Sequence, residues 1–223
     1  MQLEPASLCP MQLPTQRLNC AVCLRPQSTC ICRWMTPVAH QVEVVLLQHP
    51  LEVRHAKGSA RLLQLSLPRS VLAVGEVFAE AALQALISAP LRLLATASTP
   101  KYTILLYPDL PQHQTLGLPA PPALAAERLR DPSQLRLIVL DGTWRKSRKM
   151  LYLNPLLHAL PRLALRDMPA SGYRIRKAHK PDQLSTLEAT CAALAQLEGN
   201  AEPFAPLLAA FDGFVAQQWA YQV

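Results

Sequence analysis

Short apolar runs alternate with stretches of helical periodicity along most of the chain. Four runs of β-branched and aliphatic residues predict strands, at 41–48, 71–74, 102–107 and 135–140, and the first of them is expected to be buried. Apolar positions at helical spacing predict helices at 56–67, 78–87, 143–153, 184–197 and 204–221. Strands that alternate with helices are typical of a mostly parallel sheet with helices on both faces. We therefore predict an α/β fold.

Local signals sharpen two parts of this pattern. Ser185 and Glu188 have the spacing of a capping box, so the fourth predicted helix is expected to start at Ser185. Residues 108–132 are rich in proline and predict a long connection with one or two helical turns.

Composition excludes several classes of protein. Half of the 223 residues are hydrophobic, which suffices for a full core. The chain has 21 prolines against seven glycines and lacks the glycine-rich loops of ordinary dinucleotide and nucleoside-triphosphate sites. It shows neither a secretory signal nor an apolar run that could span a bilayer. We expect a cytoplasmic protein with reduced thiols and no membrane partner.

Positive charge is concentrated in one stretch of the chain. The formal net charge is +7, and residues 141–180 contain ten Lys and Arg against two acids, so this stretch holds all the excess. A surface of this kind suits a polyanion, either RNA or DNA. The alternative is a solvated basic face that has no partner.

Four of the six cysteines lie within thirteen residues, at Cys20, Cys23, Cys30 and Cys32. Four thiolates at this spacing predict a closed tetrahedral zinc site, which folds a segment and leaves no open position for catalysis. The alternatives are two disulfides or four unrelated thiols. Cys9 lies outside the compact spacing and Cys191 falls on an apolar helix face, so both are expected to be plain thiols.

Asp141 directly follows the predicted strand 135–140. Ligands of open α/β sheets bind at the carboxyl ends of the strands, which is where an active-site acid belongs. Gly142 permits a close backbone approach and Thr143 can cap the next helix. The alternative is that Asp141 itself caps that helix. Four basic residues of the helix could bind phosphates beside the acid: Arg145, Lys146, Arg148 and Lys149.

Two further groups of residues are candidates for binding or catalysis. The alternation of residues 173–176 predicts an extended segment that presents Arg174 and Arg176 to one side, with Tyr173 able to stack on a base. The alternative is a surface strand whose arginines are solvated. His49, which follows the first strand, is a weaker candidate because a turn histidine is more often a satisfied structural residue.

Six motifs resemble those of the DTW-domain family, and they occur in order over about residues 20–190. They are the cysteine cluster, His49-Pro50-Leu51-Glu52, Leu106-Tyr107-Pro108, Leu140-Asp141-Gly142-Thr143-Trp144, Tyr173-Arg174-Ile175-Arg176-Lys177 and Leu184-Ser185-Thr186-Leu187-Glu188. Within this family the chain resembles the bacterial tRNA-uridine aminocarboxypropyltransferases. It departs from the family at residues 57–60, where an Asn-Thr pair is expected.

The resemblance implies a fold and a cofactor. The family is related to the SPOUT methyltransferases, so a knotted α/β core is expected at 37–223, after an N-terminal zinc-binding segment at 1–36. The knot loops would hold S-adenosylmethionine, the group donor. By this resemblance the cofactor-binding residues are Leu106, Tyr107, Pro108, Leu140, Gly142, Leu184, Ser185 and Thr186.

The resemblance also implies an activity. The 3-amino-3-carboxypropyl group would move to N3 of a uridine in the variable loop of tRNA, at position 47, with release of methylthioadenosine. Asp141 is the candidate base, with Thr143 and Trp144 as further catalytic residues. The RNA would bind to Arg145, Arg148, Lys149, Tyr173, Arg174, Arg176 and Lys177. No obligatory protein partner is expected.

Two other functions fit the same residues. An RNA methyltransferase would use the same fold, the same cofactor and the same basic face. A non-catalytic, zinc-bearing RNA-binding module would explain the cysteines and the charge, but it gives no reason for an Asp-Gly-Thr-Trp motif at a strand end.

Overall fold

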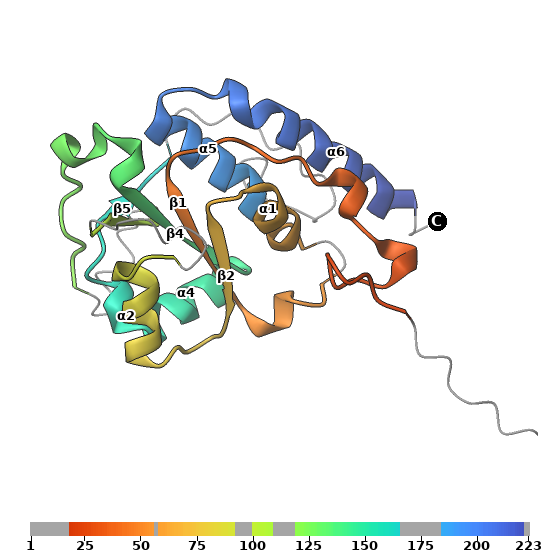
Figure 1. Ribbon diagram of the computed structural model, residues 1–223. Helices are drawn as coiled ribbons and strands as arrows, with labels where there is room; N and C mark the ends of the chain where they lie inside the picture. Colours follow the sequence, from red (N-terminus) through yellow and green to blue (C-terminus); the bar gives the residue numbers. More distant parts are fainter. Residues whose placement is uncertain (1–17, 56–57, 92–99, 109–118, 166–183, 221–223) are drawn as a thin grey trace, which may run out of the picture.

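The computed structural model describes residues 18–55, 58–91, 100–108, 119–165 and 184–220. Its centre is a five-stranded parallel sheet in the order β2-β1-β4-β3-β5 (Figure 1). The strands are β1 Glu43–Gln48, β2 Ser70–Val74, β3 Tyr102–Leu106, β4 Leu135–Asp141 and β5 Arg162–Leu163. The predicted parallel α/β sheet is confirmed.

The two central strands, β1 and β4, are buried along their whole length. Their long apolar runs reflect this position, because a strand covered on both faces has no polar side. All four predicted strands are present, with ends that differ by one or two residues. Strand β5 was not predicted, since two residues carry no periodic signal.

Five α-helices lie in the described part of the chain, and the predicted helices correspond to them. They are α1 Ala60–Ser66, α2 Glu80–Ser88, α4 Trp144–Leu153, α5 Thr186–Glu198 and α6 Ala205–Ala220. Short 3-10 helices connect them: η1 Gln27–Thr29, η2 Cys32–Trp34, η3 Pro50–Glu52, η5 Ala126–Leu129, η6 Pro132–Gln134, η7 Pro155–Leu157 and η8 Glu202–Phe204.

Two predictions about helices have clear outcomes. The helix predicted to begin at residue 56 begins later, at Ala60, because Gly58 and Ser59 are not helical. The start of α5 was predicted correctly: Ser185 is its N-cap and forms a complete capping box with Glu188. Of the proline-rich connection, the described residues 119–132 contain the single helical turn η5 and the start of η6.

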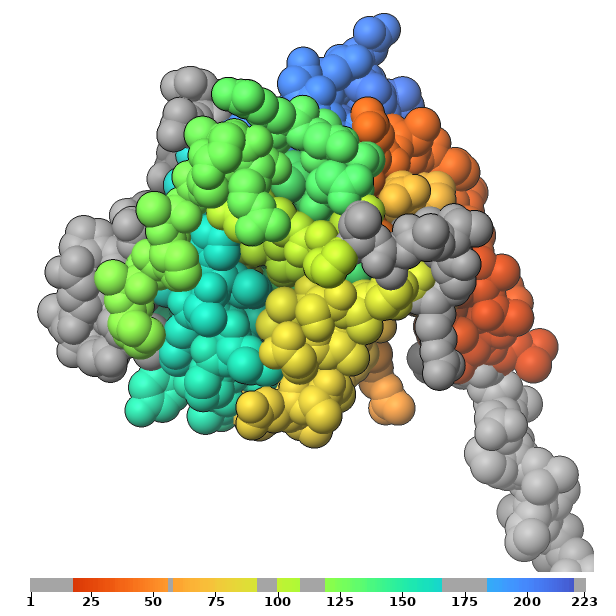
Figure 2. All heavy atoms as spheres, turned by 60° about the vertical axis from the view of Figure 1, so that its left-hand side comes forward, coloured from red at the N-terminus to blue at the C-terminus, as the bar shows by residue number. Residues whose placement is uncertain are grey.

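Helices cover both faces of the sheet, as predicted (Figure 1). Side chains of α1, α5 and α6 pack on one face, against alternate sheet residues such as Val44 and Leu137. Side chains of α2 and α4 pack on the other face, against Val45 and Ile138. In Figure 2, α2 and the α4–η7 region lie side by side on the second face.

The cysteine-bearing segment packs against α1 and α6. Cys23 and Ile31 belong to the same apolar core as α6. The indole ring of Trp34 lies so close to Gly213 that a Cβ at this position would collide with it, and Trp34 Nε1 donates to Gln217 Oε1. Glycine at position 213 therefore permits this close approach. None of the described helices is both long and apolar enough to cross a membrane.

Candidate active site and metal centre

Asp141 is the last residue of β4 and lies opposite Gln48, the last residue of β1. Its side chain is 3% exposed. Gln48 Nε2 donates to one carboxylate oxygen at 2.9 Å, and Thr186 Oγ1 donates to the other at 2.7 Å. The strand ends and the start of α5 thus fix the orientation of this carboxylate.

Helix α4 begins immediately after this acid. Thr143 is its N-cap, and the Thr143 hydroxyl accepts from the backbone N–H of Lys146 at 3.4 Å. The alternative in which Asp141 caps the helix is therefore wrong. A Cβ on Gly142 would lie 3.1 Å from the Cβ of Lys146, so this glycine allows the chain to turn tightly from strand to helix.

An aromatic pair connects the end of β3 to the start of α4. The rings of Tyr107 and Trp144 meet edge to face, with centroids 5.9 Å apart. Tyr107 is buried, which raises the pKa of its hydroxyl, and the guanidinium of Arg162 lies 5.6 Å from its ring centroid. Three segments that are distant in sequence, around residues 107, 141–144 and 185–186, therefore come together at the carboxyl edge of the sheet.

The basic residues of α4 have different surroundings. Lys146 forms an ion pair with the buried carboxylate of Glu52 at 2.9 Å. Lys149 forms one with Glu76, also at 2.9 Å, although the lysine side chain stays 58% exposed. Arg145 and Arg148 are exposed, and neither has an acidic partner among the described residues.

His49 has a structural role at the end of β1. Its Nδ1 accepts from the backbone N–H of Leu51 at 3.2 Å and so caps η3. Nε2 therefore carries the proton and donates to Glu76 at 2.8 Å. Hydrogen bonds from Lys149 and then His49 lower the pKa of Glu76. The His-Pro-x-Glu motif thus connects β1 to α4 through two carboxylates.

The remaining predicted site residues have varied positions. Tyr173, Arg174, Arg176 and Lys177 lie outside the described residues. Leu140 and Ser185 are buried and Gly142 is half-buried, all at the carboxyl edge. A surface hollow lined by Tyr102, Arg128 and Asp131, among others, lies at the opposite edge, where β3 begins.

Gln48 and Glu76 were missed in the sequence. The signal for Gln48 was its position as the last residue of a strand, where the carboxyl ends of parallel neighbours meet. Glu76 gave no signal, because it follows the weakly patterned strand β2 and its partners come from two other elements.

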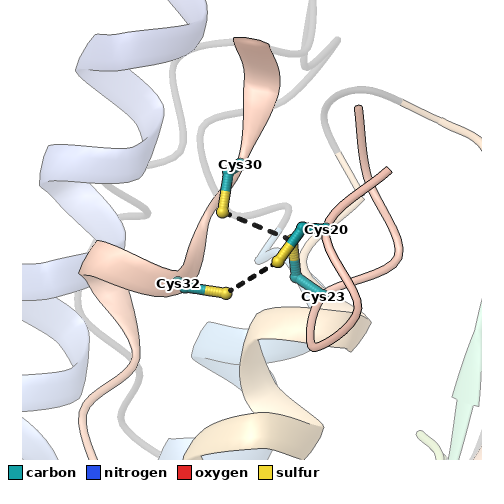
Figure 3. Close-up of side chains that lie close together, drawn as sticks. All are labelled: Cys20, Cys23, Cys30 and Cys32. Atoms are coloured by element: carbon teal, nitrogen blue, oxygen red, sulfur yellow. Dashed lines mark hydrogen bonds between the residues drawn. The ribbon is translucent and has the colours of Figure 1, made fainter. Parts of the chain in front are cut away.

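The four clustered cysteines point toward a common centre (Figure 3). Their sulfurs all lie within 4.8 Å of one another, and the Cys20–Cys32 and Cys23–Cys30 sulfur distances are 3.5 and 3.7 Å. Four sulfurs each about 2.3 Å from a tetrahedral zinc ion would be roughly 3.8 Å apart. None of these cysteines forms a disulfide. The donor set and its spacing therefore fit a metal ion.

The cysteines differ in their acidity. Backbone N–H groups of Cys23 and Val22 lower the pKa of Cys20 to about 6, whereas burial raises that of Cys32 to about 12. Cys191 is a buried thiol on the apolar face of α5, as predicted, and burial raises its pKa to about 12.

Comparison with known proteins places the chain in a family. A family model described as the DTW domain matches residues 17–219. A Drosophila melanogaster protein named tRNA-uridine aminocarboxypropyltransferase 2 is 30% identical over 197 residues, which cover 85% of this chain and 70% of the relative. The mouse protein of the same name is 28% identical over 86% of this chain and 60% of its own length.

A plant relative matches a smaller part of the chain. An Arabidopsis thaliana protein named tRNA-uridine aminocarboxypropyltransferase A is 29% identical over 61% of this chain and 51% of its own length. The chain thus spans between half and about two thirds of these curated relatives. No solved structure matches. The family match over nearly the whole sequence shows that this chain belongs to the DTW-domain family.

Proposed function

We propose that this protein transfers the 3-amino-3-carboxypropyl group of S-adenosylmethionine to N3 of a uridine in the variable loop of tRNA. The names of its relatives support this activity. The observation that carries the proposal is the meeting of three motif segments at the carboxyl edge of the sheet, around one oriented carboxylate. Ligands of open α/β sheets bind at this edge.

The reaction requires a base and an aligned electrophile. The donor supplies a γ-carbon activated by its sulfonium, and alignment decides which of the three carbons on sulfur reacts. In the proposed step Asp141 takes the proton from uracil N3. The N3 electron pair forms the new carbon–nitrogen bond, and the carbon–sulfur electron pair leaves with methylthioadenosine.

The described contacts suit Asp141 for this role. Hydrogen bonds from Gln48 and Thr186 use one acceptor position on each oxygen and hold the carboxylate in one orientation. Burial also strengthens these hydrogen bonds by excluding water.

The surrounding segments would bind the donor and complete the catalytic site. We assign the donor to Leu106, Tyr107, Pro108, Leu140, Gly142, Leu184, Ser185 and Thr186, which flank the carboxylate. Thr143 would set the start of α4. The ring of Trp144, which is 53% exposed and packs on Tyr107, would cover the donor.

The tRNA would bind the basic surface of the chain. Arg145, Arg148 and Lys149 lie on α4, directly after the proposed base. The segment with Tyr173, Arg174, Arg176 and Lys177 would add contacts to phosphate or to the donor carboxylate. The polyanionic substrate accounts for the excess of positive charge in residues 141–180. A knotted core, the division after residue 36, a cytoplasmic location and the lack of an obligatory protein partner stay predictions.

The cysteine cluster would hold a structural zinc ion. Cys20, Cys23, Cys30 and Cys32 would fill all four positions of a tetrahedral ion, so the metal would stabilise the segment that packs on α6. We expect about one zinc per chain after purification without chelators. Elemental analysis that finds no metal in folded protein would contradict this assignment.

Analysis of both products tests the proposed activity. The protein is incubated with unmodified tRNA and S-adenosylmethionine, and the nucleosides and the small-molecule product are identified by mass. Aminocarboxypropyluridine with methylthioadenosine is the expected result. Methylated uridine with adenosylhomocysteine would identify a methyltransferase instead. Binding of tRNA with neither product would favour the non-catalytic RNA-binding module.

A further inference from the structure

Helix α4 carries an exposed row of aromatic and basic side chains. Trp144, Arg148 and Tyr152 are spaced four residues apart, so they follow one another along one side of the helix. Trp144 is 53% exposed and Tyr152 is 57% exposed, and Arg145 lies beside them on the surface. We refer to these four residues as the α4 row.

The exposure of two large aromatic rings on one helix is unusual for a surface that binds nothing. Aromatic side chains contribute most when buried, and a helix that only packed on the sheet would place them inward. Here Ser147, Met150 and Leu151 form the inward face of α4. Among the described residues, Trp144 contacts the ring of Tyr107 edge to face, and more than half of the surface of Trp144 and of Tyr152 stays exposed.

The charges of α4 divide into two groups. Lys146 and Lys149 pair with Glu52 and Glu76, which fix the helix to the ends of β1 and β2. The Lys146 pair is the stronger constraint, because the Glu52 side chain is 3% exposed and that of Glu76 is 29% exposed. The arginines of the row have no acidic partner within the described residues. Their charge faces solvent and is available to a ligand.

We infer that the α4 row binds unpaired nucleotides of the RNA substrate, with bases stacked on Tyr152 and on the face of Trp144 that is turned away from the donor, and with phosphates bound by Arg145 and Arg148. This inference rests on the proposed function, which makes tRNA the substrate. Base stacking on aromatic rings combined with arginine contacts to the backbone is how proteins bind single-stranded nucleic acid. A base inside a duplex cannot stack on a side chain, so the α4 row would select unpaired nucleotides.

The dimensions and position of the row fit this ligand. Eight residues of helix separate Trp144 from Tyr152, a rise of about 12 Å. This equals three to four stacked nucleotides at roughly 3.4 Å each. The row begins three residues after Asp141, at the end of α4 nearest the proposed base. A strand bound along α4 would therefore lead toward the carboxylate.

The test compares four single variants in binding of unmodified tRNA transcript, measured by fluorescence anisotropy over a range of KCl. Tyr152→Ala is expected to weaken binding roughly 5- to 100-fold with an unchanged salt slope, because it removes stacking and no charge. Tyr152→Phe keeps the ring and is expected to bind as the parent protein does. Arg148→Ala is expected to reduce the salt slope by about 0.7–0.9, the loss of one phosphate contact.

Arg130→Ala is the charge-matched control, because Arg130 is exposed at the opposite edge of the sheet. It is expected to change neither affinity nor slope. Equal binding by Tyr152→Ala and Tyr152→Phe would overturn the inference, as would equal salt slopes for Arg148→Ala and Arg130→Ala. If duplex RNA competes with tRNA as strongly as a single-stranded RNA of the same length does, the inferred preference for unpaired nucleotides is wrong.

Product analysis of the parent protein separates this inference from the proposed function. If aminocarboxypropyluridine forms while Tyr152→Ala binds tRNA normally, the inference about the α4 row is wrong and the proposed function stands. If no modified uridine forms while Tyr152→Ala loses affinity for tRNA and Tyr152→Phe does not, RNA binding by the α4 row is supported and the proposed enzymatic function fails.

Discussion

Each end of the strand pair β1 and β4 buries a carboxylate opposite a residue of the neighbouring strand, but the two carboxylates have different hydrogen-bond partners. At the amino end Glu43 lies opposite Arg136, whose guanidinium donates from Nε at 3.0 Å and from Nη2 at 2.6 Å. At the carboxyl end Asp141 lies opposite Gln48 and accepts hydrogen bonds from an amide and a hydroxyl.

The difference separates a structural carboxylate from a candidate catalytic one. The Arg136 guanidinium neutralises Glu43 and also donates to the Leu86 carbonyl, so both charges are fixed inside the fold. The hydrogen bonds from Gln48 and Thr186 come from neutral groups, and they fix the orientation of the Asp141 carboxylate at the edge of the sheet where ligands of α/β folds bind. The same two strands thus hold one acid whose loss should affect folding and another whose loss should affect catalysis.

The largest expected effect is on catalysis, at the carboxyl end. Asp141→Asn preserves the shape of the side chain and removes the base, so aminocarboxypropyl transfer is expected to fall roughly 10²–10⁴-fold. Folding and binding of S-adenosylmethionine are expected to persist. Single-turnover rates with saturating tRNA and equilibrium binding of the donor measure the two parts. Near-normal turnover would remove Asp141 from the role of base.

Gln48→Leu is the matched control at the same site. It removes one hydrogen bond from the same carboxylate and leaves the base in place. A hydrogen bond to a charged group contributes about 1.5–3 kcal/mol, so we expect a loss of roughly 10- to 150-fold. A loss as large as that of Asp141→Asn would show that orientation, and not proton transfer, limits the rate.

The next effect is on stability, at the amino end. Arg136→Met leaves the Glu43 carboxylate buried with its main partner removed, which is expected to lower the free energy of unfolding by about 3–5 kcal/mol. Urea denaturation followed by circular dichroism measures this change. Replacing both residues, as in Glu43→Met with Arg136→Met, is expected to recover most of the loss. If the single variant is as stable as the parent, the pair does not have the structural role assigned here.

These contacts also show how far the sequence could predict the molecule. The runs that became β1 and β4 and the capping box at Ser185 are local patterns, and each was predicted correctly. The spacing of the four cysteines is also local, and the structure brings their sulfurs close enough to bind one metal ion. The cross-strand partners of Glu43 and Asp141 depend on strand register, which no local pattern determines. In the sequence, nothing separates the lysines of α4 from its arginines. They differ in the structure, where the lysines form ion pairs with acids that follow β1 and β2.

The smallest expected effect is a pH dependence of stability at the amino end. His40 precedes β1, where its Nδ1 donates to the Val42 carbonyl at 2.8 Å and its Nε2 accepts from the Arg69 N–H at 3.2 Å. Burial lowers the pKa of His40 below its ordinary value of 6.5. Below pH 6.5 the unfolded chain therefore binds a proton that the folded chain excludes, so this contribution to stability is present at higher pH and is lost as pH falls. Accordingly, the stability difference between the parent protein and His40→Asn should shrink between pH 7.5 and 5.5 in urea denaturation, by less than the loss from Arg136→Met. A stability difference that stays constant over this pH range would show that folded His40 does not exclude the proton. The rate of aminocarboxypropyl transfer per folded molecule should be the same for both proteins, because His40 lies at the amino end of β1 and the proposed chemistry takes place at the carboxyl end.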